Sequence, residues 1–74
     1  MITIMCPLGD KVKEVFDGKE HEGVSFTYAS SMGPQHHFNV STEDDQAAAD
    51  IANRVIKADP DLARTGGKAK PKMF

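Results

Sequence analysis

Residues 41 to 60, STEDDQAAADIANRVIKADP, decide the fold of this chain. Their apolar side chains recur at the three- and four-residue steps of one helix face, at Ala48, Ile51, Ala52, Val55 and Ala58. Polar residues fill the opposite face, where Asp50 and Arg54 form an i,i+4 pair of opposite charge. The segment therefore predicts an amphipathic helix from about Thr42 to Ala58 that packs its small apolar residues closely on a sheet.

Both ends of this helix carry capping residues. Ser41 and Thr42 are alternative N-caps, because each is followed three residues later by an acid that would complete a capping box. The acids at residues 43 to 45 would also place negative charge at the positive end of the helix dipole. At the other end, the Asp59-Pro60 step stops the helix, and Asp59 is expected to cap a last turn that lays Leu62 on the core.

The residues before this helix predict four short strands, because apolar and polar side chains alternate along them. The strands are expected at Ile2 to Cys6, Val12 to Phe16, Val24 to Ala29 and His36 to Val40. The dipeptide Asp17-Gly18 readily takes the positive φ angles of a tight turn and predicts a hairpin between the second and third strands. The expected fold class is α+β. A small, mainly antiparallel sheet of three to four strands would pack on one C-terminal α-helix and form a single domain over residues 1 to 63.

Length and composition restrict the possible functions. A chain of 74 residues forms one domain and buries only about 60% of the surface that its unfolded form exposes. Its one cysteine, Cys6, has no partner for an internal disulfide or for a paired-cysteine zinc or redox motif. The first residues lack the basic region and long apolar run of a signal peptide, and no run approaches the ~20 apolar residues of a membrane span. We therefore expect a cytoplasmic protein that acts at no membrane.

Charge is divided unevenly along the chain. Residues 1 to 63 carry five Lys/Arg against eleven Asp/Glu, a net charge of −6, whereas residues 64 to 74, RTGGKAKPKMF, carry four cations and no acid. Because two glycines and a proline interrupt this last segment, it is expected to form an extended basic docking tail outside the domain. Its expected partner-binding residues are Arg64, Lys68, Lys70, Lys72, Met73 and Phe74.

Three roles remain open for this tail. On the acidic face of a neighbouring protein subunit, its lysines would supply charge complementarity and Met73 and Phe74 would enter an apolar pocket. On nucleic acid, its four cations would give a weak, salt-sensitive contact, but no tyrosine or tryptophan is interleaved with them and the acidic body opposes approach. The third role is that of a solubilising tail without a partner. We favour a protein partner over nucleic acid.

Residue types suited to catalysis or metal binding are present without the spacing that these functions need. His36 and His37 are adjacent on an expected strand, so their rings would point to opposite faces and could not bind one ion. Cys6 is expected to be a small buried residue and His21 a solvated one. The acids at residues 43 to 45 suit the first turn of a helix. We therefore expect no catalytic, cofactor or metal site, no small-molecule substrate and no enzymatic activity.

The segment from His37 to Leu62 resembles the closing segment of many small proteins encoded among bacteriophage head and tail genes. In those proteins a short strand leads into an alanine-rich helix that ends at an Asn/Asp-Pro-x-Leu/Phe step and is followed by an extended tail. The step is Asp59-Pro60-Asp61-Leu62 in this chain, and the resemblance covers about a third of its length. It implies a virion component such as a capsid decoration, neck or tail accessory protein, and it brings no catalytic residue.

The expected function is therefore structural. The chain would be a small virion subunit, made in the host cytoplasm, that binds repetitively to a larger protein assembly or to copies of itself. Two alternatives stay open: a small regulatory binder that inhibits a host or defence factor through its acidic surface, and a weak nucleic-acid binder that acts through the basic tail.

Overall fold

The computed structural model describes residues 1 to 72. Its elements are, in chain order, β1 (Ile2–Met5), α1 (Gly9–Phe16), β2 (Lys19–His21), β3 (Val24–Met32), β4 (Gln35–Val40), α2 (Asp45–Ala58), α3 (Pro60–Arg64) and β5 (Lys68–Pro71). The strands pair antiparallel in the order β2-β3-β4-β1-β5, so the first strand of the chain lies between β4 and the last strand. The α+β class is confirmed, with five strands where three to four were expected and three helices where one was expected.

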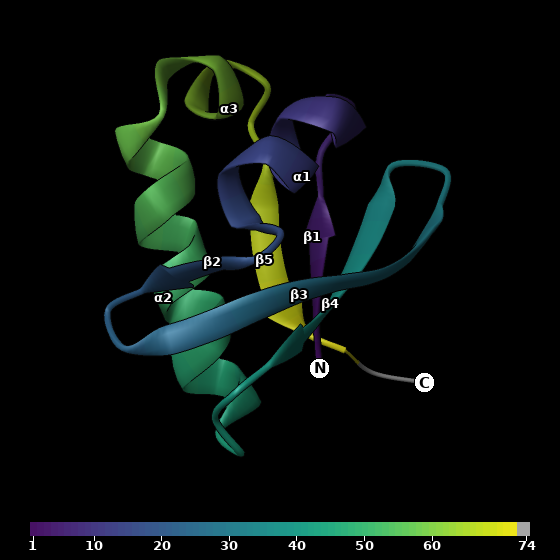
Figure 1. The fold of residues 1–74 in the computed structure, drawn as a ribbon. Coiled ribbons are helices and arrows are strands. Elements are labelled where there is room, and N and C mark those ends of the chain that lie inside the picture. Colours follow the sequence, from purple (N-terminus) through teal and green to yellow (C-terminus); the bar gives the residue numbers. More distant parts are fainter. Residues whose placement is uncertain (73–74) are drawn as a thin grey trace.

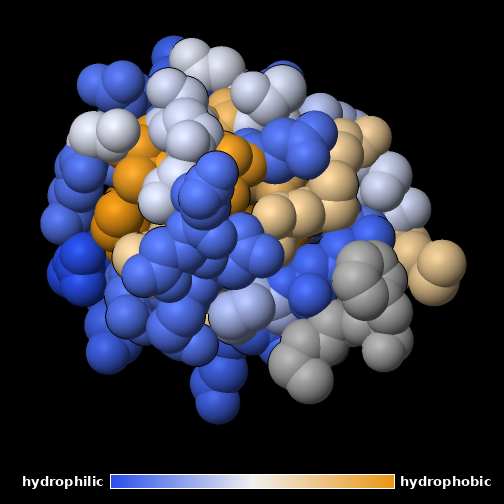
Figure 2. All heavy atoms as spheres, turned by 90° about the horizontal axis from the view of Figure 1, so that it is seen from below, coloured by the Kyte–Doolittle hydropathy of each residue, from blue (hydrophilic) through white to orange (hydrophobic). Residues whose placement is uncertain are grey.

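All three helices contribute to one core on the same face of the sheet. They place Val12 and Phe16 from α1, Ile51 and Ile56 from α2, and Leu62 from α3 against inward strand residues that include Ile2, Ile4, Phe26 and Phe38. Figure 1 shows β2 and the start of β3 crossing α2, while β5 runs alongside the same helix. Figure 2 shows an apolar patch between hydrophilic side chains on one face of the molecule.

Adjacent residues of α2 hold the two edges of the curled sheet. The Asn53 side chain donates to the carbonyl oxygen of Ala69 in β5 at 3.0 Å and accepts from the Ala69 backbone N–H at 2.8 Å. Arg54 donates through two nitrogens to the carboxylate of Glu22, which lies between β2 and β3, at 2.9 Å each. The helix thus joins both edge strands and closes the open side of the sheet.

The expected strand from Val12 to Phe16 is wrong, because these residues form the second half of α1. Val12 and Phe16 are four residues apart and both are buried, which is the spacing of a helix face. Asp17-Gly18 accordingly ends a helix and makes no hairpin turn; Gly18 has the positive φ of 71° common just after helices. The hairpin turn is Glu22-Gly23, with φ angles of 51° and 83°, and it joins β2 to β3.

The helix expected from Thr42 begins three residues later, at Asp45, and Asp44 is its N-cap. The Asp44 carboxylate accepts from the Ala47 N–H at 3.1 Å. Neither expected cap is used in that role, because the Ser41 hydroxyl accepts from the backbone N–H of Ser25 in β3. The Thr42 hydroxyl instead accepts from the Asp44 N–H. The end of the helix is as expected.

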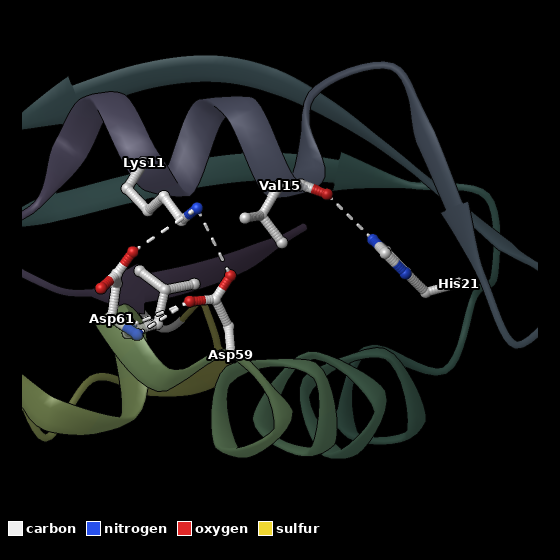
Figure 3. Close-up of polar contacts among 6 residues, drawn as sticks. Lys11, Val15, His21, Asp59 and Asp61 are labelled. Atoms are coloured by element: carbon white, nitrogen blue, oxygen red, sulfur yellow. Dashed lines mark hydrogen bonds and ion pairs between the residues drawn. The ribbon is translucent and has the colours of Figure 1, made fainter.

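Asp59 caps the short helix α3, and Leu62 is fully buried. One oxygen of the Asp59 carboxylate accepts from the backbone N–H groups of Asp61 and Leu62. Its other oxygen lies 3.7 Å from the Lys11 ammonium of α1, which is also 3.7 Å from the Asp61 carboxylate. Figure 3 shows this bridge, which ties α1 to α3 above the core.

The expected boundary between a domain ending at residue 63 and a free tail is contradicted, because residues 68 to 71 form strand β5. This strand pairs with β1 through partners that include Thr3 with Lys70 and Ile4 with Ala69. Ala69 is buried in the core, and the Lys72 N–H donates to the carbonyl oxygen of Met1. The basic segment is therefore part of the fold.

Candidate docking face

The face of the sheet opposite the helices, called the outer face below, is made of alternate residues of each strand. A β-bulge at Ala29 shifts the register of β3, so that Ser30 rather than Ala29 lies opposite His37. Following the registers, the outer face consists of Glu20 from β2; Ser25, Thr27, Ser30 and Met32 from β3; Gln35, His37 and Asn39 from β4; Thr3 and Met5 from β1; and Lys68 and Lys70 from β5. One residue of this set is an acid, and it lies at the edge opposite the lysines.

Two rows of side chains cross four strands of this face. One row runs through residues that pair in succession, Ser30, His37, Thr3 and Lys70, and the other through Met32, Gln35, Met5 and Lys68. The rows end on the same strand, so both lysines lie at one edge of the outer face. A partner that covered this face would meet hydroxyl, amide and imidazole groups in the middle and two ammonium groups at the side.

The middle of the face is ordered by a hydrogen bond between neighbouring strands. Thr3 Oγ1 lies 2.9 Å from His37 Nδ1, and Thr3 is only 3% exposed although it lies on the outer side of β1. The two methionines are open to solvent, Met5 at 38% and Met32 at 73%. Methionine adapts its shape to irregular apolar surfaces. The outer face therefore offers two adaptable apolar side chains beside the half-buried His37 imidazole, which the buried Thr3 holds in place.

The structure divides the expected partner-binding residues into separate places. Lys68 and Lys70 lie together on the outer face, whereas Arg64 is exposed at the end of α3. Lys72 is half-buried and follows β5. Met73 and Phe74, expected as apolar anchors, lie outside the described residues. Of the expected set, two lysines are therefore brought together on one face with residues that the sequence analysis did not select, foremost Met5, Met32 and His37.

A second surface feature is an open groove of about 610 Å³ between α2 and the segment that leads into β5. Three cations, Arg54, Lys57 and Lys68, lie on its border, and the Asn53 side chain already bonds both backbone groups of Ala69 there. Its lining residues are Asp50, Asn53, Arg54, Ile56, Lys57, Ala63, Gly66, Gly67, Lys68 and Ala69. Lys68 therefore stands where the groove and the outer face meet.

Glu22 and Arg54 form an ion pair beside the groove, because Arg54 is one of its lining residues. The two hydrogen bonds from Arg54 lower the pKa of the Glu22 carboxyl below its ordinary value. The same bonds raise the pKa of the Arg54 guanidinium. The charged forms of both residues are therefore favoured in the fold, which suits a pair that holds β2 against α2.

The histidines and the cysteine take three different roles. His36 and His37 point to opposite faces of β4, as predicted, with His36 inside and His37 outside. His21, expected to be solvated, is half-buried instead: its Nε2 donates to the Val15 carbonyl oxygen (Figure 3). Its ring lies 5.4 Å from the Phe16 ring. Cys6 is buried, as expected, and accepts a hydrogen bond from the Leu8 N–H.

Comparison of this chain with family models, with curated proteins and with solved structures finds no match to any of them. Within residues 1 to 72, no helix has the length and apolar character needed to cross a membrane.

Proposed function

We propose that this chain is a small structural subunit that docks on an acidic surface of a larger protein assembly through the outer face of its sheet. The observation that carries the proposal is the composition of that face: Lys68 and Lys70 stand at one edge beside Met5, and the one acid of the face, Glu20, is at the other edge. Acidic partner groups would pair with the lysines, and apolar partner groups would cover the methionines.

A strand suits this role better than a free arm would. A disordered tail must lose its conformational freedom on binding, whereas β5 already holds Lys68 and Lys70 in place through its pairing with β1. A protein therefore remains the proposed partner. The proposed contact surface is the preformed outer face and not a flexible tail.

The aromatic residues favour protein over nucleic acid as the partner. Sheets that bind single-stranded nucleic acid stack bases on exposed aromatic side chains. Here Tyr28 and Phe38 lie opposite each other on the inner face, with ring centroids 5.7 Å apart, and the outer face holds no aromatic residue besides the imidazole of His37. The phage-particle setting is proposed on the resemblance of the segment from His37 to Leu62 alone.

The test is a pair of charge-reversed variants in the native complex. Lys68→Glu/Lys70→Glu should lose the complex, whereas Lys57→Glu/Arg64→Glu changes the net charge equally but leaves the outer face intact and should retain it. Binding of the unmodified chain should weaken as salt rises. Equal loss in both variants would show that overall charge, rather than the outer face, drives association.

Native mass measurement of the same complex distinguishes a structural role from a regulatory role by the number of copies bound. Many copies of the chain in one particle are the expected result. A complex of one copy with one host protein would overturn the structural role in favour of a regulatory binder.

A further inference from the structure

A chain of hydrogen-bonded side chains leads from the surface to the interior at the hairpin of β3 and β4. Tyr28 Oη lies 2.6 Å from Ser31 Oγ, and Ser31 Oγ lies 2.8 Å from His36 Nδ1. The other ring nitrogen, His36 Nε2, lies 2.9 Å from the carbonyl oxygen of Cys6. All three side chains are on the inner side of the hairpin, opposite the outer face, so this cluster is separate from the proposed docking surface.

The protons of this cluster can be placed by elimination. A backbone carbonyl only accepts, so His36 Nε2 must donate to the Cys6 oxygen. In a neutral imidazole the other nitrogen, Nδ1, is then an acceptor, and the Ser31 hydroxyl must donate to it. Ser31 Oγ in turn accepts from the Tyr28 hydroxyl. A serine hydroxyl that donates to an imidazole nitrogen is the arrangement by which a histidine activates a nucleophile.

A nucleophile and its base need an accessible hydroxyl and a fixed imidazole, and the burial of Ser31 and His36 fits this need. His36 is only 5% exposed, whereas Ser31 is exposed to solvent. The imidazole also fills the space beside Gly9, where a Cβ atom would lie 2.8 Å from His36 Cε1. The base is therefore held between a carbonyl oxygen and a glycine, and the hydroxyl that it activates is open to a reagent.

We propose that Ser31 is a nucleophile activated by His36 and that it accepts acyl groups from activated esters. Ser31 Oγ attacks the ester carbonyl carbon, and its proton passes to His36 Nδ1. The Cys6 carbonyl holds the Nε2–H of the resulting imidazolium, in the position that a carboxylate occupies in a Ser-His-Asp triad. The Tyr28 hydroxyl, 2.6 Å from Ser31 Oγ, is the donor beside the reacting oxygen.

When the tetrahedral intermediate collapses, the bond to the leaving oxygen breaks and His36 Nδ1 returns the proton to that oxygen. The products are an acylated Ser31 and a free alcohol. The step needs no cofactor or oxidant. It goes beyond the docking function and departs from the expectation that the chain holds no reactive site.

The neighbouring serine provides a matched control. Ser30 is adjacent to Ser31 and is also exposed, but it lies on the outer face opposite His37. The protein would be incubated with 4-nitrophenyl acetate, and acetylation would be located by mass spectrometry of the intact chain and its peptides. We expect one acetyl group on Ser31, labelling unchanged in Ser30→Ala, and at least tenfold slower labelling in Ser31→Ala.

Two further variants test the activating groups. His36→Gln should abolish labelling of Ser31, and circular dichroism would show whether this buried variant folds. Should it not fold, Tyr28→Phe takes its place: it keeps the ring against Phe38, removes the hydroxyl, and should slow acetylation several-fold. Acetylation of Ser30 and Ser31 at equal rates, labelling confined to lysines, or unchanged labelling in Ser31→Ala would overturn the proposal.

Discussion

At the scale of single residues, Gly9 is a position where one methyl group should change stability. A Cβ atom there would lie 2.8 Å from His36 Cε1. The imidazole cannot easily move, because hydrogen bonds hold both of its nitrogens. We expect Gly9→Ala to lower the free energy of unfolding by about 1 to 3 kcal/mol, as overpacking does elsewhere.

Denaturant melts would measure this effect, with Gly67→Ala as the control. A Cβ at Gly67 meets its nearest neighbour at an ordinary 3.4 Å, and its φ is not positive. A Gly9→Ala variant as stable as Gly67→Ala would mean that His36 can shift without loss, and the fixed position of the proposed base would then be wrong.

The pair formed by Glu22 and Arg54 predicts a dependence of stability on pH. Because Arg54 lowers the pKa of Glu22 in the folded chain, the folded state binds the proton less readily than the unfolded state does. The contribution of the pair is therefore present above the ordinary range of a glutamate carboxyl. It is lost as the pH falls through that range and below it.

Glu22→Gln should make unfolding less sensitive to acidic pH, and Glu43→Gln, which removes an exposed acid outside this pair, is the control. Thermal melts between neutral and acidic pH would show the difference. Identical profiles for Glu22→Gln and the unmodified chain would contradict a role for this pair. The expected effect is small, because both side chains are largely exposed.

At the scale of elements, β5 is protected against pairing with another chain. An edge strand offers unpaired backbone groups to any neighbour. The Asn53 side chain bonds both backbone groups of Ala69, and Pro71 has no N–H to offer. At the other side of the sheet, the Asp17 carboxylate accepts from the Tyr28 N–H in β3. Side chains thus satisfy backbone groups near both edges, which leaves the outer face, rather than an edge, as the surface for docking.

Asn53→Ala should remove two hydrogen bonds to Ala69 and cost about 1 to 3 kcal/mol of stability. Hydrogen exchange should become faster at the Ala69 amide. Asn39→Ala is the matched control, because Asn39 is exposed on the outer face of β4. Unchanged exchange at Ala69 in the Asn53 variant would show that β5 is held by its pairing with β1 alone.

The same elements show what the sequence could and could not predict. Local periodicity predicted a helix from about Thr42 to Ala58, which forms from Asp45 to Ala58 with a different N-cap, and the cap at Asp59 was predicted correctly. The segment from Val12 to Phe16 is too short to distinguish the 3.6-residue period of a helix from the two-residue period of a strand. Its five residues fit either pattern. β5 depends on a partner far away in the sequence, β1, and on the Asn53 side chain. A glycine- and proline-containing segment gives no local sign of such pairing.

Which residues meet on the candidate surfaces also depends on strand pairing between distant segments. The alternation of Lys68 and Lys70 is visible in the sequence, but the placement of Met5 and Met32 in one row follows only from the pairing of three strands. The bulge at Ala29, which brings Ser31 opposite His36, has no local signal in the sequence.

At the scale of the whole molecule, the two ends of the chain are joined at the sheet. β1 lies between β4 and β5, so the first and last strands stabilise each other. Without β5, β1 would become an edge strand, and the buried side chains of Ile2 and Ile4 would lose the cover of Ala69. A domain of this size has a total stability of only about 5 to 15 kcal/mol. The fold therefore has little stability to spare for the loss of a strand.

Deletion of residues 68 to 74 tests whether this segment is a structural strand or a docking tail outside the domain. A tail outside the domain would leave the melting temperature nearly unchanged when it is removed, whereas the loss of β5 should lower the melting temperature strongly or unfold the chain. Lys68→Glu/Lys70→Glu is the companion variant, because it keeps the strand and changes only exposed side chains. We expect this variant to melt near the unmodified chain and yet to fail in docking. A truncated chain that melts normally would show that β5 contributes nothing to the fold, and the outer face would then lose the strand that carries its lysines.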